Sequence, residues 1–158
     1  MYSFAESESW VQKAKDYHDD ANILIDYGKK HGPTSRIYYS AFYCAKALLT
    51  LHKIKAARHS SVISLFGRLL VKEKGVDKKF GRFLNKTFNE RKKADYDISL
   101  GKLNREELKA LLRISSEFIQ TTQDYIDRIK LSNGNKNTDA VVEAQRVVTV
   151  GQRPLGIN

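Results

Sequence analysis

The sequence contains one cysteine, two prolines and one tryptophan among its 158 residues. The single cysteine, Cys44, excludes an intramolecular disulfide and a CxxC metal pair, and its place in an apolar helical pattern predicts a buried thiol. No apolar run approaches the ~20 residues that a membrane-spanning helix needs. The N-terminal sequence MYSFAESES is acidic and unlike a signal peptide. We therefore expect a cytoplasmic protein that contacts no membrane.

Two further absences concern ligand sites. The glycines form neither a Walker motif nor a dinucleotide-binding pattern, and no spacing of His, Cys, Asp or Glu is typical of a metal site. We therefore expect no cofactor and no metal ion. A chain of this length is expected to form one main domain, which buries ~68–70% of the surface of the unfolded chain.

Acidic residues are missing from a long central stretch. Residues 31–71 contain six Lys or Arg residues and no Asp or Glu, a net charge of +6. Residues 72–93 contain nine basic and three acidic residues, again a net charge of +6, within a chain whose total is +10. This concentration suits a polyanion such as RNA, or an acidic protein partner. A solubilising surface without a partner is the alternative.

Apolar residues recur every three or four positions as far as residue 131, which is typical of amphipathic helices. No segment before residue 131 has the period of two that a half-buried strand shows. The helices are expected to cover approximately residues 7–27, 33–53, 60–73, 77–96 and 104–131. Short loops between them predict an all-α fold, an up-and-down antiparallel bundle of about five helices.

Particular residues predict where these helices begin and which side chains face inward. The expected capping or starting residues are Ser7 or Ser9, Pro33, Ser60 or Ser61, Asp77, and Asn104 with Glu107. The expected inward residues of the first helix are Trp10, Ala14, Tyr17, Ala21 and Leu24. Those of the second helix are Ile37, Ala41, Ala45, Leu48 and Leu49.

The composition changes after residue 131. The sequence NGNKNTD predicts a linker, and the residues that follow it are too few to form a core of their own. The sequence VVTV fits either a strand or the end of a short helix. We predict a helical domain over residues 1–131, and over residues 132–158 a linker and C-terminal arm that packs on this domain or on a partner.

The segment FGRFLNKTFNERKKADY, residues 80–96, is interpreted as one helix whose apolar stripe leads into a charged cluster. The stripe consists of Phe80, Phe83, Leu84 and Phe88. Arg91 continues the stripe three residues later, and Asp95 follows Arg91 by four, so we expect a charge-assisted hydrogen bond between them. A cation beside an apolar face is costly unless it is paired or used, so this segment is the predicted functional region.

Three segments in this order and spacing resemble a known family: SRIYYSAFYCAKALL (35–49), RHSSVISLFGRLLV (58–71) and RKKADYD (91–97). They are similar to the HEPN family (higher eukaryotes and prokaryotes nucleotide-binding), and more narrowly to its small stand-alone prokaryotic members, over about residues 8–130. The resemblance implies a helical bundle that forms a homodimer. In many members it also implies metal-independent RNA cleavage, in toxin–antitoxin, CRISPR-associated and anti-phage systems. A minimal nucleotidyltransferase is often the partner of such a protein.

In HEPN nucleases an Arg is followed after four to six residues by a His, and two copies form one composite site. Arg91 matches the Arg, but Tyr96, Asp97 and Ile98 stand where the His would fall. The His would act as general acid or base because its pKa lies near the working pH. A Tyr with a pKa of ~10 does not match that role, so the sequence leaves cleavage open.

The candidate site residues follow from this resemblance. The candidate catalytic residues are Arg91, Asp95 and Tyr96, and the candidate nucleic-acid-binding residues are Arg91, Lys92, Lys93, Arg58 and His59. His59 becomes a candidate substitute acid if it contacts Arg91 or Asp95 in the fold.

Each candidate also has a structural interpretation. The Arg91–Asp95 pair could end the helix and fix the dimer register, and Lys92 and Lys93 could form a solvated helix end. Tyr96 could be buried with its hydroxyl bonded to a neighbouring helix, and His59 could pack or order its loop. The cluster Tyr38, Tyr39, Phe42 and Tyr43 could stack on bases, or form core and dimer interface.

The leading hypothesis is a homodimeric HEPN protein of a prokaryotic toxin–antitoxin or defence module. It would bind RNA or nucleotide in a basic dimer cleft, with metal-independent RNA cleavage left open. The alternative is a non-catalytic binding module that docks a partner nucleotidyltransferase. A third hypothesis is an enzyme whose acid–base group has moved to Tyr96, Asp95 or His59.

Overall fold

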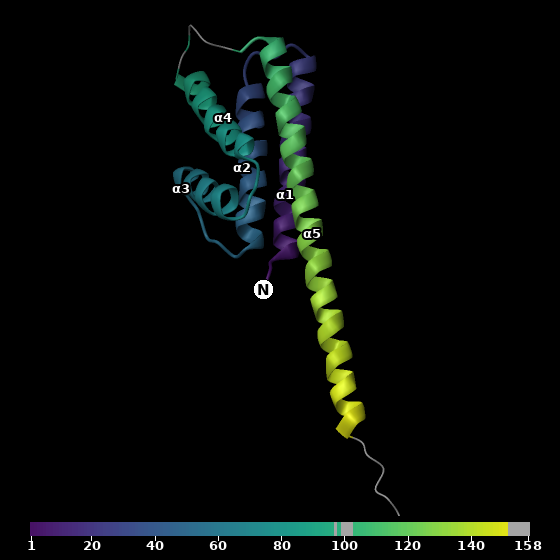
Figure 1. Ribbon diagram of the computed structural model, residues 1–158. Coiled ribbons are helices and arrows are strands. Elements are labelled where there is room, and N and C mark those ends of the chain that lie inside the picture. Colours follow the sequence, from purple (N-terminus) through teal and green to yellow (C-terminus); the bar gives the residue numbers. More distant parts are fainter. Residues whose placement is uncertain (97, 99–102, 152–158) are drawn as a thin grey trace, which may run out of the picture. The chain divides into compact units, whose positions relative to one another are not determined.

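The computed structural model describes residues 1–96, 98 and 103–151, and the side chains of these residues as far as 146. The fold is all-α, as predicted, and the described part of the chain contains no strand (Figure 1). The elements are α1 (Phe4–Asp26), α2 (Pro33–Leu51), α3 (His59–Leu65), the π-helix η1 (Phe66–Glu73), α4 (Lys78–Tyr96) and α5 (Arg105–Gly151).

The chain divides into two units, Met1–Ile126 and Asp127–Asn158. The first unit contains α1 to α4 and the first part of α5, and it holds every site residue discussed below. The second unit contains the rest of α5. The predicted division between a domain over residues 1–131 and an arm over residues 132–158 stays a prediction.

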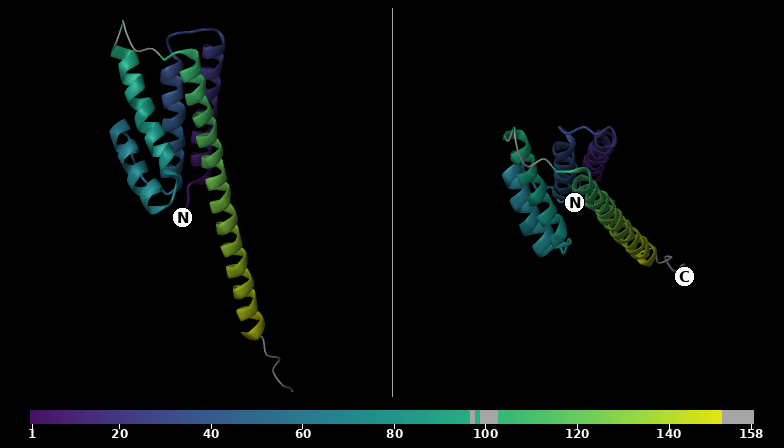
Figure 2. Two further views of the ribbon diagram at one scale, coloured as in Figure 1. Left: turned by 45° about the horizontal axis from the view of Figure 1, so that its top comes forward. Right: turned by 90° about the horizontal axis from the view of Figure 1, so that it is seen from above.

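Helix α2 forms the centre of the first unit, with α1 and α4 packed against it (Figure 2). Thirteen of its 19 residues are buried, as expected for a helix packed against several others. The five inward residues predicted for it are all fully buried, so this prediction is confirmed. Cys44 is also fully buried, and burial raises the pKa of its thiol to about 12.

Phenylalanine rings from three elements pack together beside α2. The ring centroid of Phe118 on α5 lies 4.7 Å from that of Phe80 on α4 and 5.5 Å from that of Phe66 on η1. All three side chains are almost completely buried. Burial of each ring stabilises the fold by roughly 1.5–3 kcal/mol, so this contact holds α4 and η1 against α5.

The start of α1 differs from the prediction. The helix begins at Phe4, and neither Ser7 nor Ser9 caps it. Ser7 is buried and donates a hydrogen bond of 2.7 Å to the carbonyl oxygen of Ala47, which satisfies its hydroxyl inside the core. The buried face is consequently Ser7, Val11, Ala14, Ala21 and Ile25. The predicted Trp10, Tyr17 and Leu24 are only half-buried, because the inward face of α1 includes the polar Ser7, which an apolar stripe does not indicate.

Other helix starts follow their predicted residues. Pro33 lies in the first turn of α2. Asp77 accepts a hydrogen bond from the backbone N–H of Lys79 (2.9 Å), and Asn104 accepts one from that of Glu107 (2.8 Å).

The third predicted helix is different in two respects. It begins at His59 after Arg58, and no side chain caps it, so the prediction of Ser60 or Ser61 as its cap was wrong. From Phe66 it continues as a π-helix, a local widening that apolar periodicity does not predict.

The segment predicted as a linker is helical, because α5 continues without a break to Gly151. Gly costs about 0.8–1.0 kcal/mol relative to Ala in a helix interior, and Asn and Asp are weak helix formers. Extending an existing helix adds a hydrogen bond for each residue fixed, whereas starting one is costly. The Thr138 hydroxyl also donates to the carbonyl oxygen of Gly134 at 3.0 Å. The favourable extension of α5 therefore outweighs the weak helix propensity of these residues.

Candidate functional site

Arg91 lies where the apolar stripe of α4 would continue. Its side chain is 25% exposed, and its guanidinium packs on aromatic rings of α2. The guanidinium carbon lies 4.9 Å from the ring centroid of Tyr39 and 5.4 Å from that of Tyr38. Cation–π contacts of this kind contribute about 0.5–2 kcal/mol each, more when desolvated. Aromatic faces therefore accommodate the cation at a position where the periodicity would otherwise require an apolar residue.

The contact between Arg91 and Asp95 is weaker than predicted. Arg91 Nε lies 3.3 Å from Asp95 Oδ2, which makes an ion pair. The geometry is not that of a hydrogen bond, and the buried Nε–H has no acceptor among the described residues. The predicted hydrogen bond is therefore not formed through Nε. Because Asp95 is half-exposed, the pair contributes about 0–1 kcal/mol, and the rings do more to hold Arg91.

His59, the first residue of α3, lies in the same aromatic cluster. Its ring centroid is 4.5 Å from that of Phe42, with the rings nearly parallel, and 6.4 Å from that of Phe88. Its Nδ1 lies 2.5 Å from the hydroxyl oxygen of Tyr38, within hydrogen-bonding distance. Burial, and then the positive charge of Arg91, lower the pKa of His59 below its ordinary value of 6.5. The imidazole is therefore mainly neutral at pH 7.

Tyr38 joins the two candidate groups. Its side chain is fully buried, and desolvation raises the pKa of its hydroxyl, although Arg91 opposes this shift. The phenol is therefore neutral at physiological pH. Its ring contacts the guanidinium of Arg91, and its hydroxyl contacts the imidazole of His59. The fold thus brings a cation and a neutral imidazole together on one tyrosine.

The structure bears on both interpretations of His59. The histidine packs against the aromatic rings of the cluster, as its structural interpretation predicts. The functional interpretation asked for contact with Arg91 or Asp95; His59 and Arg91 instead both contact Tyr38, and the charge of Arg91 acts on the imidazole. A cation that can bind phosphate and a group that can transfer protons near pH 7 are two components of metal-independent RNA chemistry.

Most of the neighbouring aromatic rings pack against other side chains of the same chain. Tyr38, Phe42 and Tyr43 are buried, which confirms their assignment to the core, whereas Tyr39 is half-buried. The Tyr43 ring stacks on Trp10 and lies under the ammonium group of Lys13, 4.7 Å from the ring centroid. Desolvation, followed by a hydrogen bond with Tyr17, raises the pKa of Tyr43 to about 12.

The end of α4 is open to solvent. Tyr96 is 86% exposed, so the interpretation of Tyr96 as a buried tyrosine was wrong. It is the last residue of α4 and therefore follows the turn in which Arg91 packs on α2. Ile98 is 98% exposed, and Asp97 lies outside the described residues.

The remaining predicted residues are also exposed. The ammonium group of Lys92 lies 4.8 Å from the ring centroid of Phe88, and Lys93 forms an ion pair of 3.7 Å with Glu90. Arg58 immediately precedes α3. Lys92 and Lys93 thus lie next to Arg91 in the sequence, and Arg58 next to His59, and all three are exposed.

Sequence reasoning missed the role of Tyr38, which it assigned only to an aromatic cluster. Two signals could have found it. A buried tyrosine hydroxyl needs a hydrogen-bond partner, and His59 is the only histidine in the three family-like segments. Their pairing is a tertiary contact between α2 and α3, and neither residue's local sequence shows it.

Two general features are absent from the part of the chain that the structure describes. Among residues 1–96, 98 and 103–151, no group of three or more His, Cys, Asp or Glu side chains is arranged to hold a metal ion. Within these same ranges, no helix combines the length and the apolar character that crossing a membrane requires.

Most of this chain is similar in sequence to known proteins. A family model described as "HEPN domain" matches residues 7–125. A UPF0332 protein of Thermotoga maritima is 33% identical over 123 residues, which cover 78% of this chain and 92% of that protein. Two proteins of Methanocaldococcus jannaschii, each named "Putative toxin", are also similar. One is 33% identical over 134 residues (84% of this chain, 90% of that protein), and the other 30% over 125 residues (79% and 87%).

Proposed function

Because this chain belongs to the HEPN family, we propose that it is the HEPN component of a toxin–antitoxin-type module and that it binds RNA through the surface around Arg91. The match over residues 7–125 confirms the resemblance that the three sequence segments indicated. The names of the two Methanocaldococcus relatives support the toxin–antitoxin assignment. The proposal places the protein in the cytoplasm, where such a module would meet RNA.

One observation carries the RNA-binding proposal: Arg91 and His59 meet on Tyr38. The Arg91 side chain is 25% exposed, and a guanidinium cation suits the oxygens of a phosphate. The exposed Lys92, next to Arg91 in the sequence, and Arg58, next to His59, add positive charge. Charge of one sign around a cleft raises the local concentration of a polyanion.

We propose further that the protein acts as a homodimer in which the two α4 ends face each other across a basic cleft. The exposed side chains of Tyr96 and Ile98 support this arrangement. Both are large and apolar, and a second copy would remove them from water. The two Arg91 side chains would then contribute to one composite site.

A second candidate function, metal-independent RNA cleavage, is favoured by the position of His59. Positions 96–98 contain no histidine, but His59 reaches the Arg91 cluster from α3. Of the three groups considered as substitutes, His59 has both contact with this cluster and a pKa range suited to proton transfer. Asp95 and Tyr96 remain candidate catalytic residues by position alone.

The experiment is incubation of the purified protein with tRNA and with total RNA, without metal ions. Binding is followed by gel shift, and cleavage by the appearance of 2′,3′-cyclic ends. The proposal expects a shifted complex that Arg91→Ala weakens and that Lys86→Ala leaves unchanged. Lys86 is a suitable control because it is an exposed cation on the same helix. An unshifted wild-type sample would contradict RNA binding, and intact RNA after incubation would remove the cleavage candidate.

The alternative, a non-catalytic module that docks a minimal nucleotidyltransferase, predicts a different result. The protein would co-purify with the product of an adjacent nucleotidyltransferase gene and would show no RNA affinity of its own. This outcome would indicate that the basic surface binds a protein partner and not RNA.

A further inference from the structure

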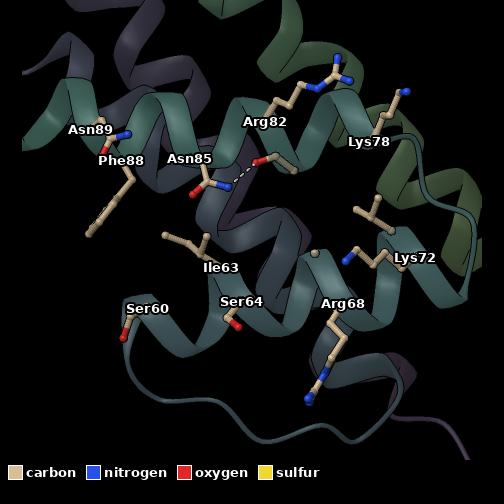
Figure 3. A pocket seen from close by; sticks show the side chains of 13 residues that line it. Ser60, Ile63, Ser64, Arg68, Lys72, Lys78, Arg82, Asn85, Phe88 and Asn89 are labelled. Atoms are coloured by element: carbon tan, nitrogen blue, oxygen red, sulfur yellow. Dashed lines mark hydrogen bonds between the residues drawn. The ribbon is translucent and has the colours of Figure 1, made fainter.

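A second basic feature lies beside the Arg91 cluster. A groove of about 730 Å³ runs between α3–η1 on one side and α4 on the other (Figure 3). We call it the α3–α4 groove. Ile63 and Phe88 point into the space between the two helices, and Arg68 and Arg82 extend from the two rims. The groove therefore has an apolar floor and basic edges.

The basic edges carry unpaired charge. Four cations line the groove (Arg68, Lys72, Lys78 and Arg82), and no Asp or Glu is among its lining residues. All four are exposed, and none forms an ion pair with a described residue. Their neighbour Lys79, by contrast, pairs with Glu117 at 2.7 Å. Like charges gathered along both edges of one groove repel each other, and a bound polyanion would relieve this repulsion.

Glycine keeps the middle of the groove open. Gly67 on η1 lines the groove, and a Cβ atom placed on it would meet nothing within 4 Å. Gly81 lines the opposite wall, where a Cβ atom would lie 3.6 Å from Val71 Cγ2. The floor can therefore accept an extended chain without rearrangement of the helices.

Phe88 connects this groove to the Arg91 cluster. It lines the groove, yet its ring centroid is 5.5 Å from that of Tyr38, and the ammonium group of Lys92 lies over its ring. A strand that leaves Arg91 would pass Phe88 before reaching the groove. Phe88 offers an aromatic side chain on which a base can stack.

We infer that the α3–α4 groove binds the single-stranded RNA segment that flanks the nucleotide held at Arg91. This inference rests on the proposed function. From Lys78 to Phe88, α4 advances about 15 Å at the usual rise of ~1.5 Å per residue. That length matches about four stacked nucleotides at ~3.4 Å each. The amide of Asn85 and the hydroxyl of Ser64 supply polar groups for bases or ribose.

The continuity through Phe88 favours RNA over an acidic protein as the occupant. An acidic peptide would be attracted by the same charges, but it would have no reason to continue toward Arg91. The apolar floor alone does not discriminate between them, so the experiment includes an acidic peptide as a competitor.

The test compares two labelled RNAs, a four-nucleotide and a twelve-nucleotide oligouridylate, by fluorescence anisotropy. The groove variant is Arg68→Ala with Arg82→Ala. The matched control is Lys74→Ala with Lys86→Ala, which removes the same charge from exposed positions that do not line the groove. A third variant, Gly67→Leu, fills the open floor and leaves the charge unchanged. Circular dichroism checks that each variant is folded.

The inference predicts that the wild-type protein binds the longer RNA at least about tenfold more tightly than the shorter one. The groove variant should lose this gain and bind the shorter RNA as tightly as the wild-type protein does. For the longer RNA, the slope of log affinity against log salt concentration should fall in magnitude by about 1.4, the value for two lost phosphate contacts. Gly67→Leu should also lose the gain, whereas the control should keep it.

Any of four results would overturn the inference. The length-dependent gain could survive in both groove variants while Arg91→Ala still weakens binding, which would leave the proposed function intact. The groove variant and the control could lose affinity equally, which would indicate a general charge effect. A twelve-residue polyglutamate peptide could compete as well as the longer RNA, which would assign the groove to an acidic protein. A wild-type protein that binds neither RNA would contradict the proposed function itself, and the inference with it.

Discussion

The hydroxyl oxygen of Tyr38 lies 2.5 Å from Nδ1 of His59. Because Tyr38 is fully buried, its hydroxyl has no access to bulk water and depends on this partner. The contact fixes the imidazole relative to α2. Arg91 packs on the ring of the same tyrosine, so one residue of α2 orients a group from α3 and a group from α4.

Replacement of Tyr38 by Phe should separate the hydrogen bond from the packing. The ring and its contact with Arg91 are retained, and the bond to His59 is lost. We expect the free energy of unfolding to fall by about 0.5–1.5 kcal/mol, the usual contribution of a neutral hydrogen bond. Urea denaturation measures this change. Tyr96→Phe is the matched control, because the Tyr96 side chain is 86% exposed, and equal effects in both variants would contradict the structural role of Tyr38.

Stability should fall as the pH decreases from 7.5 to 5.5. The folded state lowers the pKa of His59, and also that of His18 and His52, in each case mainly by burial. Below the unfolded value of 6.5, the unfolded chain therefore binds more protons than the folded chain. Protonation then favours unfolding, and the loss is complete once the pH is below the folded pKa.

Denaturation midpoints across this pH range measure the effect, and His59→Gln should reduce the slope. An NMR titration of the His59 ring gives a direct check of the cause. A midpoint at or above 6.5 for that ring would contradict the described environment, in which burial and Arg91 both disfavour the charged form.

Replacement of Asp95 by Asn should have little effect on stability, about 0–1 kcal/mol, because the ion pair is half-exposed. RNA affinity should be retained or increased, since aromatic rings hold Arg91 and a negative charge near the phosphate is removed. Anisotropy with the twelve-nucleotide RNA measures this affinity. A large loss of binding would show that Asp95, and not the rings of Tyr38 and Tyr39, positions the guanidinium.

Replacement of Arg91 by Lys should keep the charge and lose the planar stacking on Tyr39. We expect weaker RNA binding with nearly unchanged salt dependence, whereas Arg91→Ala should reduce both the affinity and the salt slope. Affinities measured at several salt concentrations distinguish the two variants. Identical behaviour of Lys and Arg would mean that stacking contributes nothing to the site.

The proposed dimer predicts that a charge at Ile98 weakens association. Ile98→Glu would place a carboxylate where a second copy is expected to cover an apolar side chain, so light scattering should show a shift from dimer to monomer. Ile23→Glu, on the exposed face of α1, is the control. A monomeric wild-type protein, or dissociation caused by Ile23→Glu alone, would contradict the proposed interface.

Much of the fold could be predicted from local patterns. The apolar period located the helices, and Asp77 and Asn104 marked the starts of α4 and α5, because capping depends on residues near in sequence. The full length of α5 could not be predicted, since helix propagation outweighs the weak propensities of residues 132–138.

The candidate site could be predicted only in part. The position of Arg91 was visible as a break in an apolar stripe. Its convergence with His59 was not, because it arises from the packing of α2, α3 and α4 around Tyr38. The α3–α4 groove had a local signal, since Arg68 and Lys72 are four residues apart, as are Lys78 and Arg82. That spacing places each pair on one helix face, but the way the two faces meet is a property of the fold.

The most direct test of the account is an NMR titration of the protein with the twelve-nucleotide oligouridylate, following the Arg91 Nε–H and the His59 ring together. If RNA binds where Arg91 and His59 meet, both signals shift with the same affinity. If the RNA binds while both signals stay unchanged and shifts appear elsewhere, the assignment of this cluster as the RNA-binding site is wrong.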